Sequence, residues 1–165
     1  MWQTFGFQLC HGLGVSKQTI SGKVMRITLD DFEGAWVLER RVMLDEGPAA
    51  QFRGSARFHA DRLGLVYEEK GLIKLDGQRP VSAQRRYLWR SGQGGVIEVS
   101  FDDGRPFHTI DPDGPADTHF CDPDTYEVNY SFGGWPDWIS TWKVTGPQKG
   151  YRMVSTYRRP VEGVD

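Results

Sequence analysis

The stretch Phe101-Asp102-Asp103-Gly104-Arg105-Pro106-Phe107-His108 carries the strongest fold signal in this sequence, and after a loop it is followed by His119-Phe120-Cys121-Asp122-Pro123-Asp124-Thr125-Tyr126-Glu127-Val128-Asn129-Tyr130. An Asp-Gly pair between alternating residues is typical of a tight β-hairpin. Asp103-Gly104 therefore predicts two short antiparallel strands. The two segments together hold two of the four histidines, one of the two cysteines and two tyrosines. We expect them to form one wall of any functional site.

The same alternation continues over most of the chain beyond Asp31. Side chains on a strand point alternately to its two faces, so residues two apart share a face. The faces predicted in this way are Gly34/Trp36/Leu38/Arg40/Val42, Gly54/Ala56/Phe58, Tyr67/Glu69/Gly71, Val81/Ala83/Arg85/Tyr87/Trp89, Ile97/Val99/Phe101, Tyr126/Val128/Tyr130/Phe132 and Tyr151/Met153/Ser155/Tyr157. Turns rich in Gly, Pro and Asp separate them, which predicts roughly eight to ten short antiparallel strands in an all-β barrel or sandwich.

Three charged residues favour the barrel over the sandwich. Arg40, Glu69 and Arg85 lie on faces that are otherwise mainly aromatic. A sandwich core has no place for such charges, whereas a barrel of this size can hold a small ligand or water in its mouth. We expect the barrel domain to span residues 29–160, with a C-terminal tail at 161–165. Residues 1–28 form an extension, for which a short helix and a flexible conformation are both open.

Composition excludes several classes of partner. The formal net charge is -2, so no basic field favours nucleic acid. No apolar run reaches the roughly 20 residues of a membrane span. The two cysteines, Cys10 and Cys121, do not suggest a disulfide framework, and the N-terminus lacks a secretory signal pattern. The sequence therefore predicts a cytoplasmic protein that binds neither nucleic acid nor membrane.

The motifs also resemble a known family. Gly34-Ala35-Trp36, with Arg158 and Arg159 late in the chain, resembles the calycin and lipocalin arrangement, in which the Trp of a Gly-x-Trp motif closes one barrel end beneath a late Arg. A longer set of motifs looks like an uncharacterised bacterial family, domain of unknown function 6314, over about residues 31–159. That set is Gly34-x-Trp36-x-Leu38-x-Arg40, Tyr67-x-Glu69-x-Gly71, Arg85-x-Tyr87-x-Trp89, Asp103-Gly104-Arg105-Pro106-Phe107-His108, His119-x-Cys121-x-Pro123-Asp124-x-Tyr126 and Gly146-Pro147-x-Lys149-x-Tyr151. The resemblance implies a calycin-like barrel. It supplies no established activity and no catalytic residues.

The charged trio has two interpretations. Glu69 and one arginine could form a self-satisfied interior ion pair that fixes strand register. Alternatively, the trio could form a polar floor for an anionic ligand, because arginine binds carboxylates through two parallel hydrogen bonds. Two arginines against one glutamate leave a surplus positive charge, which favours binding. The predicted ligand-binding residues are Arg40, Tyr67, Glu69, Arg85, Tyr87, His108, His119, Tyr126 and Tyr130.

The histidines and Cys121 allow other chemistry. His119 and Cys121 share a strand face and, with His108, could ligate zinc, although no paired metal motif is present. A haem-ligating histidine is a further alternative, as is a Cys121 nucleophile with His119 as base and Asp124 as orienter. The simpler interpretation is that these residues hydrogen-bond the backbone or pack as small apolar groups. We therefore predict no metal and no cofactor.

The predicted function is binding of a small aromatic or carboxylate-bearing molecule in the barrel, with the histidines near its rim. The alternative is a cofactor-free lyase or isomerase, with His119 or Tyr126 as acid or base and Arg85 and Glu69 as further catalytic candidates. A barrel filled with side chains, serving a structural role, is the third hypothesis. A homodimer is left open.

Overall fold

The alternating segments form ten strands, and the all-β barrel prediction is confirmed. The computed structural model describes residues 26–47, 49–114 and 116–161. Its elements are η1 (Leu29–Phe32), β1 (Gly34–Leu44), β2 (Ala50–Ala60), β3 (Gly64–Leu75), β4 (Val81–Ser91), η2 (Gln93–Gly95), β5 (Ile97–Phe101), β6 (Pro106–Ile110), β7 (Asp117–Cys121), β8 (Asp124–Gly134), β9 (Asp137–Thr145) and β10 (Gly150–Arg158). The helix considered for the N-terminal extension lies outside the described residues.

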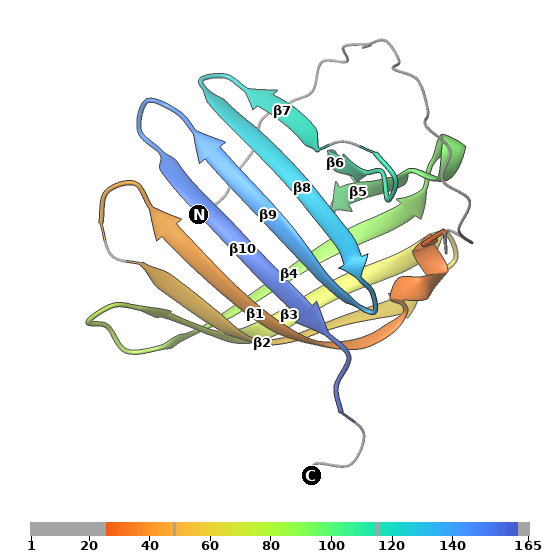
Figure 1. The fold of residues 1–165 in the computed structure, drawn as a ribbon, viewed down its shortest axis with the longest axis horizontal. Coiled ribbons are helices and arrows are strands. Elements are labelled where there is room, and N and C mark those ends of the chain that lie inside the picture. The colour runs from red at the N-terminus through yellow and green to blue at the C-terminus, as the bar shows by residue number, and fades with distance from the viewer. Residues whose placement is uncertain (1–25, 48, 115, 162–165) are drawn as a thin grey trace.

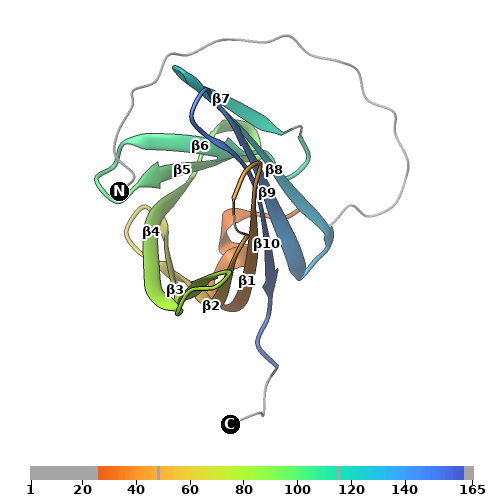
Figure 2. The ribbon, with the colours of Figure 1, turned by 90° about the vertical axis from the view of Figure 1, so that its left-hand side faces the viewer.

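The strands make one antiparallel sheet that curls into a nearly closed barrel (Figure 1). Their order is β6-β5-β4-β3-β2-β1-β10-β9-β8-β7. Strands that follow each other in the chain are therefore neighbours in the sheet, except β6 and β7, which lie at its two ends. β1 pairs with β10 and joins the two halves. Viewed along the barrel, the strands form a ring in which β6 and β7 face each other (Figure 2). In the part of the chain that is described, no helix is long and apolar enough to cross a membrane.

One end of the barrel is closed by η1 and a cluster of aromatic rings. Phe32 of η1 is fully buried, and its ring centroid lies 5.3 Å from that of Trp89 and 5.5 Å from that of Trp138. Trp36 donates its indole N–H to the Phe32 carbonyl at 2.8 Å. The Arg159 guanidinium lies 3.8 Å from the Trp36 ring centroid. This is the Trp-beneath-Arg arrangement that the sequence resemblance implies.

The predicted inward faces are also observed. On β1 the residues Trp36, Leu38 and Arg40 are buried while those between them are exposed. Gly54 and Gly71 oppose each other on the inward faces of β2 and β3. A Cβ added to Gly71 would lie 2.8 Å from the Gly54 Cα and 2.7 Å from the Phe52 ring. The two glycines therefore let β2 and β3 approach closely at this point of the sheet.

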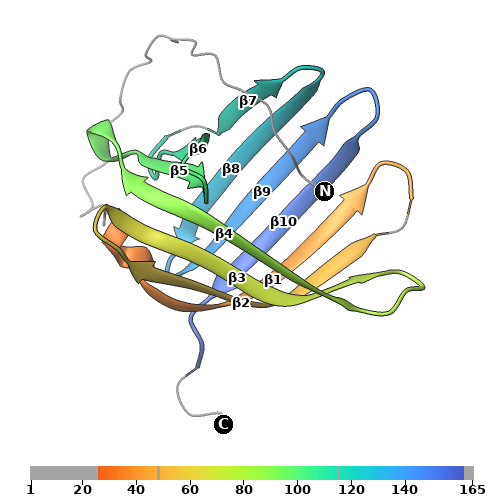
Figure 3. The same ribbon diagram turned by 180° about the vertical axis from the view of Figure 1, so that it is seen from behind.

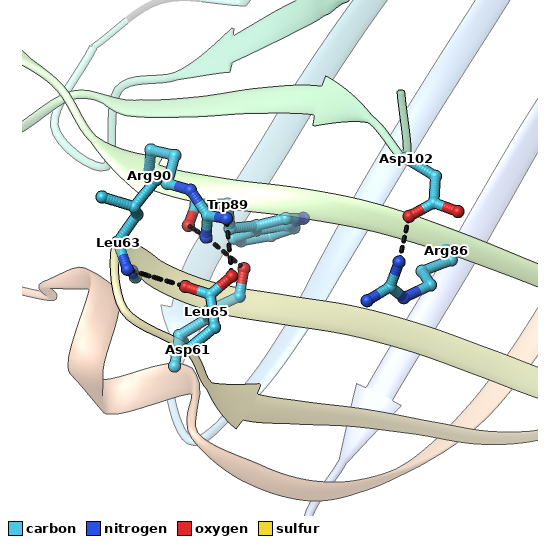
Figure 4. A network of polar contacts seen from close by, with 8 residues as sticks. Asp61, Leu63, Leu65, Arg86, Trp89, Arg90 and Asp102 are labelled. Carbon is cyan, nitrogen blue, oxygen red and sulfur yellow. Dashed lines mark hydrogen bonds and ion pairs between the residues drawn. The ribbon is translucent and has the colours of Figure 1, made fainter. Parts of the chain in front are cut away.

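Polar pairs on the outside fasten the turns and strand ends. Asp61 accepts hydrogen bonds from the backbone N–H groups of Leu63 and Gly64 and binds Arg90 of β4 at 2.7 Å (Figure 4). Arg86 of β4 pairs with Asp102 just beyond β5, also shown in Figure 4. Figure 3 shows the back of the molecule, where β4 runs beside β3 and leads toward β5. These contacts stabilise the outer face and leave the inward arginines to a separate network.

Candidate functional site

A buried ion pair inside the barrel joins β1 and β3, the two neighbours of β2. Arg40 of β1 donates two parallel hydrogen bonds to Glu69 of β3, each 2.7 Å long. The Arg40 Nε donates to the Ser155 hydroxyl at 2.8 Å, and the Tyr67 hydroxyl donates to the Glu69 carboxylate. The two charged side chains are only 7% and 2% exposed. The pair is therefore shielded from water, and the planar guanidinium of Arg40 meets the carboxylate of Glu69 through two parallel hydrogen bonds.

The pair holds both of its members in their charged forms. Burial alone would raise the pKa of Glu69, but the hydrogen bonds and charge of Arg40 outweigh it and lower that pKa. Burial likewise opposes the charge of Arg40, but the Glu69 hydrogen bonds prevail and raise the Arg40 pKa. The interior ion pair expected from the sequence is thus present. Its role in ligand binding stays a prediction.

Arg85 occupies a different position from Arg40. Its Nε lies 3.6 Å from Glu69 Oε1, and its side chain is 39% exposed. Along the inward face of β4, burial increases from Arg85 through half-buried Tyr87 to Trp89, which is 3% exposed. The barrel is therefore open at the Arg85 end and packed at the Trp89 end. Because Glu69 already accepts two hydrogen bonds from Arg40, the charge of Arg85 is only partly compensated.

Aromatic rings surround the open end. Tyr87 stacks on Phe107 with ring centroids 5.5 Å apart, and Phe107 stacks on Trp142 of β9 at 5.3 Å. Burial raises the pKa of Tyr87, although the nearby Arg85 opposes this. Tyr151 is half-buried on β10, and its pKa is raised to about 12 by burial and by Tyr126, again against the charge of Arg85. Tyr87 of β4 and Tyr151 of β10 therefore lie within the electrostatic reach of Arg85, and Tyr126 of β8 lies within reach of Tyr151. We call Arg85, Tyr87, Tyr126 and Tyr151 the mouth.

His108 lies deeper than the rim position expected from the sequence. It is 5% exposed, stacks on Tyr130 and receives or donates a 2.8 Å hydrogen bond between its Nε2 and the Tyr130 hydroxyl. The Trp142 ring packs edge-on at 4.9 Å. Burial, followed by the charge of His119, lowers the pKa of His108 to about 3. His108 is therefore a neutral core histidine at ordinary pH.

His119 and Cys121 lie on β7, beside β8. His119 is directly opposite Tyr126 in the register, and Cys121 is opposite Asp124. His119 Nε2 lies 2.9 Å from the Asp117 carboxylate, while Asp124 binds Lys149 Nζ at 2.9 Å. Within the described part of the chain, no three His, Cys, Asp or Glu side chains are grouped so that they could hold a metal ion. The histidine and the aspartates are instead engaged in pairwise contacts with their neighbours.

The interior groups hold fixed protonation states. Besides the pair and His108, burial raises the pKa values of Tyr67, Tyr130 and Tyr157. Each of these shifts moves the pKa of the group further from pH 7, so none of these groups titrates between about pH 5 and pH 9. The interior therefore offers fixed charge and hydrogen bonds rather than a group tuned for proton transfer.

Several residues of this network were not selected from the sequence. Ser155 and Tyr157 reach Arg40 and Tyr67 only because β10 pairs with β1, a contact between distant segments. The sequence does place both on the same predicted strand face as Tyr151, which was the one indication that they point into the barrel. Asp117 falls in the loop expected between His108 and His119, but in the structure it begins β7 and binds His119.

Comparisons with known proteins identify a family but no activity. The model of a family of unknown function (DUF6314) matches residues 32–159, which confirms the resemblance. No curated protein matches the sequence. An S-type phycobiliprotein lyase, CPES from Guillardia theta, is 10% identical over 82% of this chain and 92% of its own, with a TM-score of 0.49. A de novo designed fluorescence-activating β-barrel is 18% identical over 80% of this chain and 96% of its own, with a TM-score of 0.40. At these values neither similarity says what this chain binds.

Proposed function

Because this chain belongs to a family of unknown function (DUF6314), we propose its function from its own geometry: it binds a small, planar, anionic molecule at the mouth of the barrel. Arg85 binds the anionic group, and Tyr87, Tyr126 and Tyr151 contact the flat part of the ligand. The Arg40–Glu69 pair forms a fixed floor beneath it.

The surplus charge of Arg85 carries this proposal. Glu69 accepts two 2.7 Å hydrogen bonds from Arg40, whereas Arg85 approaches the same carboxylate only at 3.6 Å with its Nε. A guanidinium that is 39% exposed on an inward face retains donors for a carboxylate, sulfonate or phosphate. Its outward neighbour Arg86, by contrast, pairs with Glu68 and Asp102.

The aromatic wall supports a planar ligand. Tyr87 and Phe107 stack, as do Phe107 and Trp142, and they extend a ring surface from β4 across β6 to β9. Flat rings offer large contact areas at little cost in side-chain entropy. The fixed protonation states of the interior favour a binder over an acid–base catalyst.

An enzyme remains the second candidate, on one observation. His119 is paired with Asp117 at 2.9 Å and lies opposite Tyr126, which is the arrangement of a base and its orienting carboxylate. This candidate requires His119→Gln to abolish turnover of a bound acid without weakening its binding. The binding proposal has no such requirement.

Two fluorescent probes with the same rings test the binding proposal. 8-Anilinonaphthalene-1-sulfonate carries an anionic group, and N-phenyl-1-naphthylamine lacks it. We expect Arg85→Ala to weaken binding of the sulfonate about tenfold or more, because a hydrogen bond to a charged group contributes about 1.5–3 kcal/mol. Binding of the neutral amine should be unchanged, and Arg85→Lys should restore part of the sulfonate affinity.

Arg86→Ala is the matched control, since it removes the adjacent arginine from the outer face of the same strand. The proposal fails if Arg86→Ala weakens sulfonate binding as much as Arg85→Ala. It also fails if Arg85→Ala weakens both probes equally, because the effect would then be one of packing. Equal melting temperatures of the two variants show that both remain folded.

A further inference from the structure

The barrel has one closing line that lacks a backbone ladder. Within the described residues, every neighbouring pair in the strand order is joined by paired backbone groups, from β6–β5 through to β8–β7. The two end strands, β6 and β7, face each other across the remaining line (Figure 2). Each is five residues long, whereas β1, β2 and β4 have eleven. We call this line the seam.

The Asp117 carboxylate bridges the seam. Asp117 Oδ2 on β7 accepts the backbone N–H of Thr109 on β6 at 2.9 Å and the Thr109 hydroxyl at 2.6 Å. The same oxygen lies 2.9 Å from His119 Nε2. Burial opposes the charge of Asp117, but its hydrogen bonds from His119 and Thr109 prevail and hold its pKa well below the usual range. The link is therefore an ionised side chain with donors on both strands.

Interior aromatic residues lie directly behind the seam. His108 precedes Thr109 in β6 and is buried, and its ring centroid is 6.2 Å from that of His119 on β7. It contacts Tyr130 and Trp142. The His108 Nδ1 is buried and has no hydrogen-bond partner among the described residues. Parting of the seam would thus give access to the rings that continue into the mouth.

We propose that the barrel opens sideways along the seam, with Asp117 as its latch, and that the opening admits a flat ligand to the interior. Among the described residues, opening this line breaks side-chain contacts alone, those of Asp117 with Thr109 and those of His108 with His119 and Tyr130. Parting any other pair of neighbouring strands breaks a ladder of backbone hydrogen bonds. The opening itself does not depend on a ligand. Its use as an entrance rests on the proposed function.

Hydrogen exchange of the full chain, followed by mass spectrometry at neutral pH, tests the opening. In the unmodified protein we expect peptides covering residues 106–110 and 117–121 to exchange faster than those from β1 and β2. Asp117→Ala should speed exchange at the seam at least tenfold and leave β1 and β2 unchanged. Asp117→Asn, which keeps one acceptor oxygen, should give a smaller increase and serves as the milder variant if the alanine variant does not fold.

Asp61→Ala is the matched control. Like Asp117, Asp61 accepts two hydrogen bonds from a neighbouring segment, in its case from the backbone N–H groups of Leu63 and Gly64, and it also binds Arg90. It does so at the β2–β3 turn, away from the seam. The variant should leave seam exchange unchanged. The latch is overturned if the Asp117 variants raise exchange evenly over the barrel, or if Asp61→Ala affects the seam equally.

Stopped-flow binding of 8-anilinonaphthalene-1-sulfonate tests the entrance. Asp117→Ala should raise the association and dissociation rates together, by severalfold, with little change in affinity. If Asp117→Ala speeds hydrogen exchange at the seam but leaves the association and dissociation rates of the probe unchanged, the seam opens but is not the ligand's entrance. Absence of Arg85-dependent binding would instead refute the proposed function and leave the exchange result standing.

Discussion

Replacing Glu69 by glutamine removes the charge that compensates Arg40. The Arg40 guanidinium is 7% exposed and directs two hydrogen bonds to the Glu69 carboxylate. Breaking a buried pair by removing one partner costs about 3–5 kcal/mol, because the other charge is left uncompensated. For a chain of this length, that loss corresponds to a melting temperature lower by about 6–20 °C.

Removing the other partner should cost less. In Arg40→Met, Glu69 keeps the Tyr67 hydroxyl and has Arg85 within 3.6 Å, so its charge remains partly compensated. We expect a loss of about 1–3 kcal/mol. The double variant Arg40→Met/Glu69→Met should be more stable than Glu69→Gln, because replacing a whole buried pair by apolar residues is often neutral or stabilising.

Urea unfolding at pH 7, followed by tryptophan fluorescence, gives the free energy of unfolding for all three variants. A loss of less than about 1 kcal/mol in the free energy of unfolding of Glu69→Gln would refute this expectation, because a buried charge without a partner costs more than that. The expectation is also refuted if Arg40→Met is the more damaging single change.

Two further predictions concern acid sensitivity and the close approach of β2 and β3. The pKa of His108 falls to about 3 on folding, so as the pH is lowered the unfolded chain protonates this imidazole before the folded protein does. The free energy of unfolding should therefore decline below about pH 6.5, by up to about 1.4 kcal/mol per pH unit. Denaturation at several pH values should show this slope in the unmodified protein and in the outer-face control His59→Gln, and a flat profile between pH 6.5 and 5 in His108→Gln would confirm it. Gly71→Ala places a methyl group 2.8 Å from the Gly54 backbone and should cost about 3 kcal/mol or prevent folding, whereas Gly133→Ala, which meets no atom within 4 Å, should be nearly neutral. Equal melting temperatures of the two alanine variants would contradict the close approach of β2 and β3.

The sequence predicted the inward faces because period-two alternation is a local property. Arg40, Glu69 and Arg85 were found because charges interrupted aromatic faces. Which of the two arginines pairs with Glu69 was not predictable, since that depends on how far the sheet curls. Arg85 is the direct cross-strand neighbour of Glu69, yet the two-fold hydrogen bonds come from Arg40, two strands away.

Contacts that depend on closure of the barrel could not be predicted from local sequence patterns either. Ser155 reaches Arg40 because β10 pairs with β1. His108 was expected at the rim, but a register shift between Val99 and Ser100 accompanies the β5–β6 pairing, and the ring of His108 packs inside against Trp142. A one-residue irregularity of this kind carries no clear sequence signal.

The most direct test of anion binding by Arg85 is an NMR titration that follows the arginine Nε–H groups as 8-anilinonaphthalene-1-sulfonate is added. Arg85→Lys assigns the Arg85 signal, and Arg86 on the outer face provides the internal control. The account predicts that the Arg85 signal shifts in a saturable manner, together with signals of Tyr87 and Tyr151, while Arg86 does not move. Saturable shifts confined to outer-face residues, with Arg85 unchanged, would contradict it.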